Sequence, residues 1–295
     1  MLSIKYTIMK HLLTIDVEEW YDGLPIAGAS YPSRIDAQVR GLLALLAESN
    51  TTATFFWLGC RVKRNKELIR EVMTHGHEIA CHGWTHDFLC TQRPDNLRSD
   101  LARAKICLED AIGREISGFR APYFSIDQRS LWILDQLSEL GFAYDSSIHP
   151  VHYWRYGFAS FPARPTILTT PSGEILELPI SVRNIWGVQM PYAGGAYFRM
   201  LNYNTVARSI QIAEAKGEQV VFYLHPWELD PDHPRAFIPS TTQISHYWRL
   251  GSTGSKLRQL LLDLEFASIS SAVRHHVSPV EPIRPDRFHL SSIRT

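Results

Sequence analysis

Two histidines separated by three residues, His82 and His86, are the residues of this chain best suited to hold a metal ion. They come at the end of the short apolar run Glu78–Cys81, so one turn of helix or a tight corner after a strand could aim both imidazoles at one point. Zinc and other borderline divalent ions accept imidazole ligands. An isolated pair with this spacing is more often structural, so the metal hypothesis depends on which other polar residues reach the same place.

Three carboxylates, Asp16, Glu18 and Glu19, follow the first apolar run of the chain. In a strand, Asp16 and Glu18 would share one face while Val17 points into the core. Three carboxylates at one strand end repel one another unless a positive group lies beside them, and a metal ion together with Arg120 would supply that charge. A solvated acidic loop is the alternative for this segment taken alone.

Two later segments carry groups that could act on a substrate. Arg120 could clamp a carboxylate by two parallel hydrogen bonds. Pro122 stiffens the turn that follows, so the amide of Tyr123 could be aimed at a substrate oxygen. His225 follows an apolar run and could serve as a general acid. The alternatives are a common strand-to-loop turn for the first segment and a core histidine for the second.

Apolar, strand-like runs alternate along the chain with segments of helical periodicity, which predicts an α/β fold with a largely parallel sheet. In closed sheets of this kind the chemistry lies at the carboxyl ends of the strands, and the polar residues above fall there. The region Trp154–Pro171 is expected to be a loop. The expected strands are Leu12–Val17, Thr51–Leu58, Glu78–Cys81, Ile116–Arg120, Phe142–Asp145, Ile175–Ile180, Gln219–Leu224 and Ala267–Ser270. The expected helices are Ala37–Ala47, Lys66–His75, Pro94–Ile112, Gln128–Leu140, Tyr203–Lys216 and Ser255–Leu264.

The composition narrows the class of protein. The chain has 295 residues, a formal net charge of +0 and a pI of about 7.2, which does not fit the basic footprint of a nucleic-acid-binding protein. Its four cysteines form no CxxC pair and are expected to be reduced and mostly buried, with Cys81 in the core. We see no secretory signal and no apolar run of membrane-spanning length, so a cytoplasmic location is expected. The sequence does not indicate an oligomeric state.

The motifs in combination resemble those of the NodB-type polysaccharide deacetylases (carbohydrate esterase family 4). Thr14-x-Asp16, His82-x3-His86, Arg120-x-Pro122-Tyr123 and Leu224-His225 follow one another in the family's order. The residues within and around these motifs resemble those of one branch of the family, the deacetylases found beside exosortase/PEP-CTERM exopolysaccharide gene clusters. The resemblance implies a distorted (β/α)7 barrel over residues 10–272, with a family-specific part from about residue 230, and an extended tail over residues 273–295.

The resemblance also implies a reaction, the hydrolysis of N-acetyl groups on N-acetylhexosamine units of a poly- or oligosaccharide. A divalent metal, zinc before cobalt, nickel or manganese, would be bound by Glu18, His82 and His86. Asp16 would take the proton of water while Arg120 holds Asp16 ionised. The amide of Tyr123 would support the oxyanion, and His225 would protonate the leaving amine.

This chain departs from the family pattern at two places. Val17 occupies the position of the family's second aspartate, so the carboxylate ligand shifts to Glu18, which shares a strand face with Asp16, or to Glu19. The family's Asp-Trp motif is missing, and Asp145 is expected to orient His225 in its place.

Other functions stay open at this point. Relatives with altered acidic motifs act on cyclic amides and ureides, so a cyclic amidase like allantoinase is the first alternative. A non-catalytic glycan-binding protein is the second. The presence of Asp16, both histidines, Arg120 and His225 together argues against it, because binding alone does not need an acid–base pair. Sugar rings could pack on aromatic residues, and the stretch Gly194–Arg199 resembles a loop whose backbone approaches a ligand, although core or turn roles are the simpler explanation. The aromatic candidates are Trp84, Tyr123, Trp154, Trp186 and Tyr197.

Overall fold

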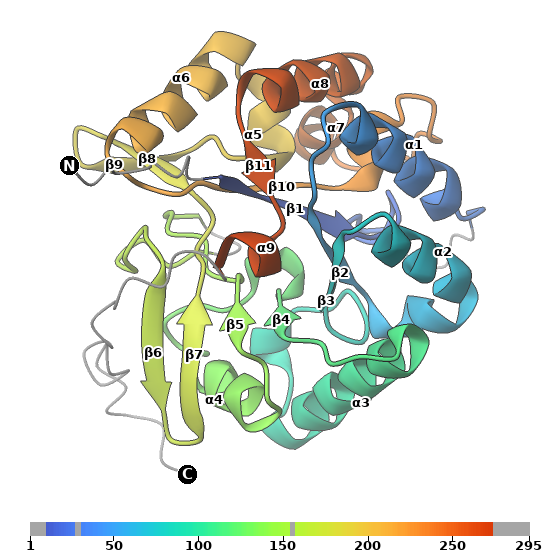
Figure 1. Cartoon of the computed structure of the whole chain (residues 1–295), viewed down its shortest axis with the longest axis vertical. Coiled ribbons are helices and arrows are strands. Elements are labelled where there is room, and N and C mark those ends of the chain that lie inside the picture. The colour runs from blue at the N-terminus through green and yellow to red at the C-terminus, as the bar shows by residue number, and fades with distance from the viewer. Residues whose placement is uncertain (1–9, 27–30, 154–156, 274–295) are drawn as a thin grey trace, which may run out of the picture.

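A curled parallel sheet forms the centre of the computed structural model, which describes residues 10–26, 31–153 and 157–273 (Figure 1). Trp154 and the expected tail after residue 273 therefore lie outside the described residues. Neighbouring strands in the order β10-β1-β2-β3-β4-β5-β7 run parallel, and the expected distorted (β/α)7 barrel is confirmed. These strands are β1 (His11–Val17), β2 (Thr54–Trp57), β3 (Glu78–Cys81), β4 (Gly118–Phe119), β5 (Tyr144–Asp145), β7 (Gly173–Glu177) and β10 (Val221–Leu224).

Irregular backbone spans the gap between β7 and β10. The amide of Ser181 donates to the carbonyl of Val221 at 3.3 Å, and the amide of Tyr223 donates to the carbonyl of Ala193 at 3.0 Å. A Cβ atom on Gly194 would lie 1.8 Å from the carbonyl oxygen of Tyr223, so only glycine permits this approach. Of the two roles considered for the stretch Gly194–Arg199, the turn packed against β10 is seen at Gly194, while Gly195, Ala196 and Arg199 also line the cavity described below.

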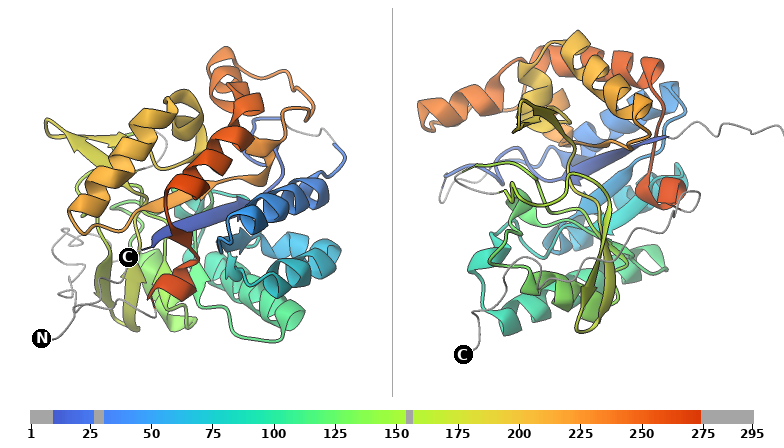
Figure 2. Two further views of the ribbon diagram at one scale, coloured as in Figure 1. Left: turned by 45° about the horizontal axis from the view of Figure 1, so that its top comes forward. Right: turned by 90° about the vertical axis from the view of Figure 1, so that its left-hand side faces the viewer.

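All six expected helices are present and cover the outside of the sheet (Figure 2). The longest one shows why they form. Pro94 occupies its first turn, and Gly113 ends it with φ of 72°, a left-handed conformation that glycine adopts without strain. The six are α1 (Ile35–Glu48), α2 (Val62–Thr74), α3 (Pro94–Ile112), α4 (Trp132–Glu139), α6 (Tyr203–Ala215) and α8 (Thr253–Asp263).

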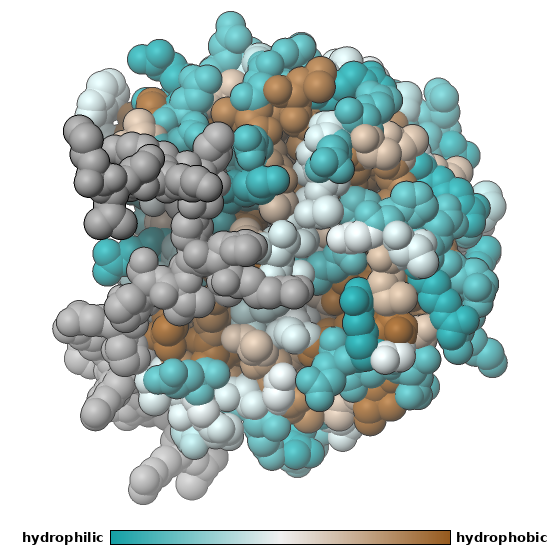
Figure 3. Space-filling model, in the orientation of Figure 1, coloured by the Kyte–Doolittle hydropathy of each residue, from teal (hydrophilic) through white to brown (hydrophobic). Residues whose placement is uncertain are grey.

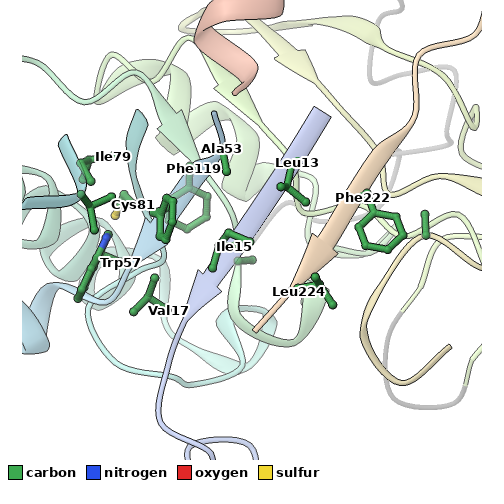
Figure 4. Close-up of a cluster of buried hydrophobic side chains, with 14 of the residues drawn as sticks. Leu13, Ile15, Val17, Ala53, Trp57, Ile79, Cys81, Phe119, Phe222 and Leu224 are labelled. Atoms are coloured by element: carbon green, nitrogen blue, oxygen red, sulfur yellow. The ribbon is translucent and has the colours of Figure 1, made fainter. Parts of the chain in front are cut away.

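Both faces of β1 are buried, as expected of a barrel strand enclosed by helices. Alternate residues point outward into the layer between sheet and helices (Figure 4). Cys81 lies in this layer, as expected, but Cys60 is exposed and the other two thiols are only partly buried, so the expectation of mostly buried cysteines was wrong. The outward layer includes Leu13, Ile15 and Val17 of β1, Trp57 of β2, Phe119 of β4 and Phe222 of β10.

A short C-terminal element covers the amino ends of the strands. Strand β11 (Phe266–Ala267) pairs with β1, and helix α9 (Ile269–Val273) follows it at once, so only the first residue of the expected strand Ala267–Ser270 is in a strand. The amide of Ile269 donates to Thr54 at the start of β2 at 2.8 Å. Ile269 itself is buried in the interior cluster. The cavity described below lies at the opposite end of the strands.

Several elements of the C-terminal half were not expected. Strand β6 (Thr166–Thr170) pairs antiparallel with β7, which makes the expected loop at Trp154–Pro171 wrong over these residues. The available signal was its composition, since four of its five residues, TILTT, are β-branched. The hairpin of β8 (Val182–Ile185) and β9 (Val188–Pro191) and the helices α5 (Gly195–Met200) and α7 (Ser240–Tyr247) complete the set.

The surface in Figure 3 is largely hydrophilic over the outer helices, with hydrophobic residues in smaller patches between them. Within the described residues, we find no helix whose length and apolar character would let it span a membrane. The boundary between a barrel over residues 10–272 and a separate tail stays a prediction.

Candidate active site

A cavity of about 220 Å³ opens at the carboxyl ends of the strands. It gathers residues that the sequence analysis selected from segments far apart along the chain. Arg120 lies beneath it, fully buried, and Asp145 is not among its lining residues. The selected residues that line it are Asp16, Glu18, His82, His86, Tyr123 and His225.

His82 directly follows β3, and the backbone of the next strand fixes its ring. Its Nδ1 lies 2.8 Å from the carbonyl oxygen of Arg120. A carbonyl only accepts hydrogen bonds, so Nδ1 carries the hydrogen and Nε2 keeps a lone pair. Burial lowers the pKa of His82 to about 4, which leaves the ring neutral near pH 7. This tautomer and charge are those of a metal-binding imidazole.

Glu18 brings a carboxylate to both histidines of the motif. The ligand atoms of Glu18, His82 and His86 all lie within 4.8 Å of one another. Glu18 Oε2 is 2.5 Å from His86 Nε2, yet this oxygen has no partner with hydrogen-bond geometry among the described residues. Burial raises the pKa of Glu18, but His86 and His225 outweigh it and hold the pKa well below its usual range. Two imidazoles, which offer a lone pair when neutral, and one carboxylate oxygen without a hydrogen-bond partner are ligands that fit a divalent ion such as zinc.

Glu19 points elsewhere. Its Oε2 accepts a hydrogen bond from the backbone amide of Arg34 at 3.2 Å, just before α1 begins, and its own amide donates to Asp22. Glu18, and not Glu19, is thus the carboxylate beside the histidine pair.

Asp16 ends the inward face of β1 and contacts the buried guanidinium of Arg120. One nitrogen of Arg120 lies 2.8 Å from Asp16 Oδ1 and also donates to Thr14 at 2.8 Å. The remaining nitrogens donate to the carbonyl and hydroxyl of Ser146 at 2.9 and 2.8 Å. The expected pair of parallel hydrogen bonds is therefore absent, because Arg120 divides its donors between β1 and Ser146, just after β5, and holds Asp16 by only one nitrogen.

Tyr123 lies at the cavity in the short 3₁₀ helix Pro122–Phe124 with a positive φ of 57°. This conformation is uncommon for a non-glycine residue and often marks a functional position. The ring stacks on Phe88, with centroids 4.1 Å apart, and the hydroxyl donates to the carbonyl of Asp22 at 3.2 Å.

His225 follows β10 and lies between two carboxylates. Its Nε2 is 3.0 Å from Glu18 Oε1, and its Nδ1 is 2.7 Å from Glu228 Oε1. Burial lowers the pKa of His225, but the two carboxylates outweigh it and raise the pKa to about 9. The ring is therefore positively charged near pH 7 and carries a proton on each nitrogen.

Glu228 and Arg199 were not selected from the sequence. Glu228 is fully buried and also accepts the backbone amide of His225 at 3.0 Å, which fixes the histidine at the start of the 3₁₀ helix Pro226–Leu229. Arg199 in α5 donates to Glu228 at 2.6 Å. The capping-box spacing from His225 to Glu228 was a usable signal. Nothing near Arg199 in the sequence indicates its partner, which is 29 residues away.

Asp145 does not orient His225, and this expectation was wrong. Its Oδ1 accepts from the hydroxyl of Ser147 at 2.5 Å, and its carboxyl faces Glu177 on the neighbouring strand β7. The physical reason is topological, since β5 borders β4 and β7 whereas His225 follows β10. Glu228 makes the contact expected of Asp145.

Most of the aromatic candidates do not reach the cavity. Trp84 is covered by Arg103, whose guanidinium carbon lies 3.6 Å from the ring centroid, and Trp186 is exposed at the turn of the β8–β9 hairpin. Tyr197 lies in α5 and is not among the lining residues. The aromatic residues that line the cavity are Trp20, Tyr123, Phe124, Tyr223 and Trp227.

Two parts of this chain match known protein families. A family model described as polysaccharide deacetylase matches residues 29–144, and one described as a domain of unknown function (DUF3473) matches residues 146–274. Chitin deacetylase 1 of Cryptococcus neoformans is 32% identical over 96 residues, which are 32% of this chain and 20% of that protein. The chain thus spans only a small part of the length of the first curated relatives it matches.

Solved structures show the same fold. A candidate polysaccharide deacetylase from Mycobacterium smegmatis has a TM-score of 0.60 and 21% identity, with 95% of each chain covered. Puue allantoinase also reaches a TM-score of 0.60, at 14% identity, with 92% of this chain and 91% of that chain covered. Residues 29–144 are thus similar to polysaccharide deacetylases, and the described chain shares the fold of these solved structures.

Proposed function

We propose that this protein is a metal-dependent hydrolase that removes N-acetyl groups from N-acetylhexosamine units of a glycan. The observation that carries the proposal is the convergence of three kinds of group on one cavity. These are a cluster of one carboxylate and two imidazoles, a buried carboxylate on an arginine, and a charged histidine held by a second carboxylate. Amide hydrolysis needs an electrophilic centre, a base and an acid, and each group fits one of these roles.

In this proposal Glu18, His82 and His86 hold the metal ion. The ion's contribution when bound is Lewis acidity toward the acetamide carbonyl and a lower pKa for water. The fit of the site to such an ion is supported by the lone pair on His82 Nε2 and the unsatisfied Oε2 of Glu18.

Asp16 is proposed as the general base. It accepts the proton of the attacking water, and Arg120 keeps its carboxylate directed into the cavity through the 2.8 Å contact. Tyr123 closes the cavity beside His86, and the proposed role of its amide is to donate to the oxygen that becomes negative.

His225 is proposed as the general acid. It carries a proton near pH 7 because Glu228 and Glu18 stabilise its charged form. As the C–N bond breaks, His225 delivers a proton to the leaving amine nitrogen, and acetate and the free amine result. The proton taken by Asp16 and the one given by His225 balance the hydrolysis.

We propose further that the glycan is an exopolysaccharide or a precursor of one. The support for this substrate is the likeness of the motif residues to those of the exopolysaccharide-associated branch. The test is acetate release from purified protein, first stripped with a chelator and then given zinc, cobalt, nickel or manganese one at a time. We expect N-acetylated oligosaccharides to release acetate only after a metal is returned. Turnover of allantoin or other cyclic ureides without acetate release would favour a cyclic amidase instead, and sugar binding without any turnover would favour a glycan-binding protein.

A further inference from the structure

Helix α7 turns polar side chains toward the cavity and leaves an apolar one in solvent. Thr242, Ser245 and His246, spaced three and four residues apart, line the cavity from one side of the helix. Ile244, between them in sequence, is 55% exposed. Tyr247 of the same helix packs against a buried apolar cluster, so the docking of α7 does not by itself require polar residues at the cavity, and recognition of a ligand would account for them.

His246 lines the cavity and has an unused hydrogen-bonding atom. The residue is only 7% exposed, and its Nε2 is buried without a partner among the residues that the structure describes. Leaving a buried polar atom unpaired is costly, and such atoms in binding sites commonly meet a ligand. Its ring stacks on Trp227 with centroids 4.2 Å apart, and Trp227 in turn stacks on His225, so His246 lies one ring beyond the proposed general acid.

The charges nearby restrict what His246 could bind. Burial, with a smaller effect of His233, lowers the pKa of His246 to about 3, so the ring is neutral near pH 7. The nearest buried cation, Arg199, is already paired with Glu228 and bonded to backbone carbonyls. A neutral imidazole beside a compensated cation suits an uncharged hydroxyl better than a carboxylate or phosphate.

We infer that the cavity-facing side of α7 is a recognition wall for a hydroxyl of the sugar ring that carries the acetamide, with His246 as its main hydrogen-bonding residue. This inference rests on the proposed function for the identity of the ring as an N-acetylhexosamine. It concerns uncharged sugars, since α7 offers no free cation among the described residues that line the cavity.

Arg199 fixes the position of the recognition wall relative to His225, the proposed general acid. Arg199 donates to the carbonyls of Ser245 and His246 at 2.8 Å and of Trp248 at 3.1 Å, which pairs the otherwise unsatisfied carbonyls at the C-terminus of α7. The same guanidinium binds Glu228, which binds His225. A sugar seated on α7 is therefore placed at a fixed distance from the proposed proton donor.

The test compares His246→Phe with His246→Gln, using N-acetylchitotetraose as the probe. Phenylalanine keeps the stacking on Trp227 but removes both nitrogens, and we expect it to raise KM about tenfold with kcat within about twofold, the size of one lost hydrogen bond. Glutamine keeps a donor and an acceptor and should restore most of the affinity. Ile244→Ala, on the solvent side of the same helix, is the matched control and should change neither constant.

Equilibrium binding of the same tetrasaccharide to wild type and His246→Phe, measured by calorimetry, separates this inference from the proposed function. A wild type that binds but releases no acetate would end the proposed function, while about tenfold weaker binding to His246→Phe would still support the wall. Equal affinity of the two proteins, or no binding to either one, would overturn the wall whatever the activity.

Discussion

The side of the cavity built from β1, β3 and β4 and the side built from β10, α5 and α7 hold their polar groups in different ways. On the first side each group is fixed within a strand or two of its origin, as His82 is by the carbonyl of Arg120. On the second side a chain of side chains carries the constraint, from His225 through Glu228 and Arg199 to the end of α7. The first arrangement is specified by short motifs and the second by contacts between distant segments.

The two sides correspond largely to the two family matches. Residues 29–144, which include His82, His86 and Arg120, match the polysaccharide deacetylase model, whereas residues 146–274, which include Arg199, His225 and α7, match the domain of unknown function. Under the proposed function, the first side would hold the metal ion and the base, and the second side would hold the proton donor and the recognition wall. Three substitutions test this division.

Asp16→Asn should have the largest effect, because it removes the proposed base on the first side. Asparagine keeps the shape and can still accept from Arg120, but it cannot take a proton from water. We expect kcat/KM for acetate release to fall about 10³-fold, within the usual range for a general base, with a thermal melting curve close to that of wild type. A fall of less than tenfold would remove Asp16 from the mechanism and leave the first side with metal binding alone.

The sequence located the residues that meet on this first side because their determinants are local, although it did not predict how Arg120 divides its hydrogen bonds. Strand ends place Asp16, Glu18, His82 and Arg120 at one edge of a parallel sheet, and the periodicity of the apolar runs locates those ends. The same reasoning located the six outer helices to within a few residues at most ends.

The second side could not be predicted in the same way. Asp145 was given the task of Glu228 although Glu228 is only three residues from His225, and the sheet order, which separates β5 from β10, is what excludes Asp145. The pairing of Arg199 with Glu228 and the docking of α7 depend on tertiary contacts with no local pattern. Strand β6 and the β8–β9 hairpin are short, and one is half exposed, so hydrophobic periodicity marks them weakly.

Glu228→Gln should have an intermediate effect that shows in the pH profile. The Glu228 carboxylate helps to raise the pKa of His225 to about 9, so replacing it with an amide lowers that pKa. A general acid works only below its pKa, and the alkaline limb of kcat/KM should therefore move to lower pH by roughly one unit, with about tenfold lower activity well above pH 9 and little change from protonation near pH 7.

Glu265→Gln, an exposed carboxylate near the opposite end of the strands, is the control and should leave the pH profile unchanged. Arg199 loses its charged partner in Glu228→Gln, so a thermal melting curve of this variant is needed to show that it is folded. An alkaline limb that stays in place in a folded Glu228→Gln protein would mean that His225 is not the acid, and the second side would lose its proposed chemical role.

Glu177→Gln should have the smallest effect, and this effect should be on stability instead of activity. Glu177 ends strand β7 and does not line the cavity. Its carboxyl faces Asp145 between β7 and β5, and both residues are fully buried. Burial and the neighbouring Asp145 raise the pKa of Glu177 well above its usual value. The folded protein thus keeps a proton that the unfolded chain releases, so its stability falls as pH rises above the ordinary glutamate pKa. Glutamine holds its hydrogens at every pH and can donate to Asp145 while its oxygen accepts from the amide of Ile148, as Glu177 does at 3.0 Å.

We therefore expect Glu177→Gln to be more stable than wild type in urea unfolding at about pH 8, by on the order of 1 kcal/mol, with the difference shrinking toward about pH 5. Glu174→Gln, an exposed carboxylate on the same strand, should show no such trend. A stability difference that does not vary with pH would mean that the carboxyl pair shares no proton. A large loss of acetate release in a stable Glu177→Gln protein would instead give this carboxyl pair a role in the reaction. Neither Asp145 nor Glu177 lines the cavity, and the charge of Arg120 is what links them to it.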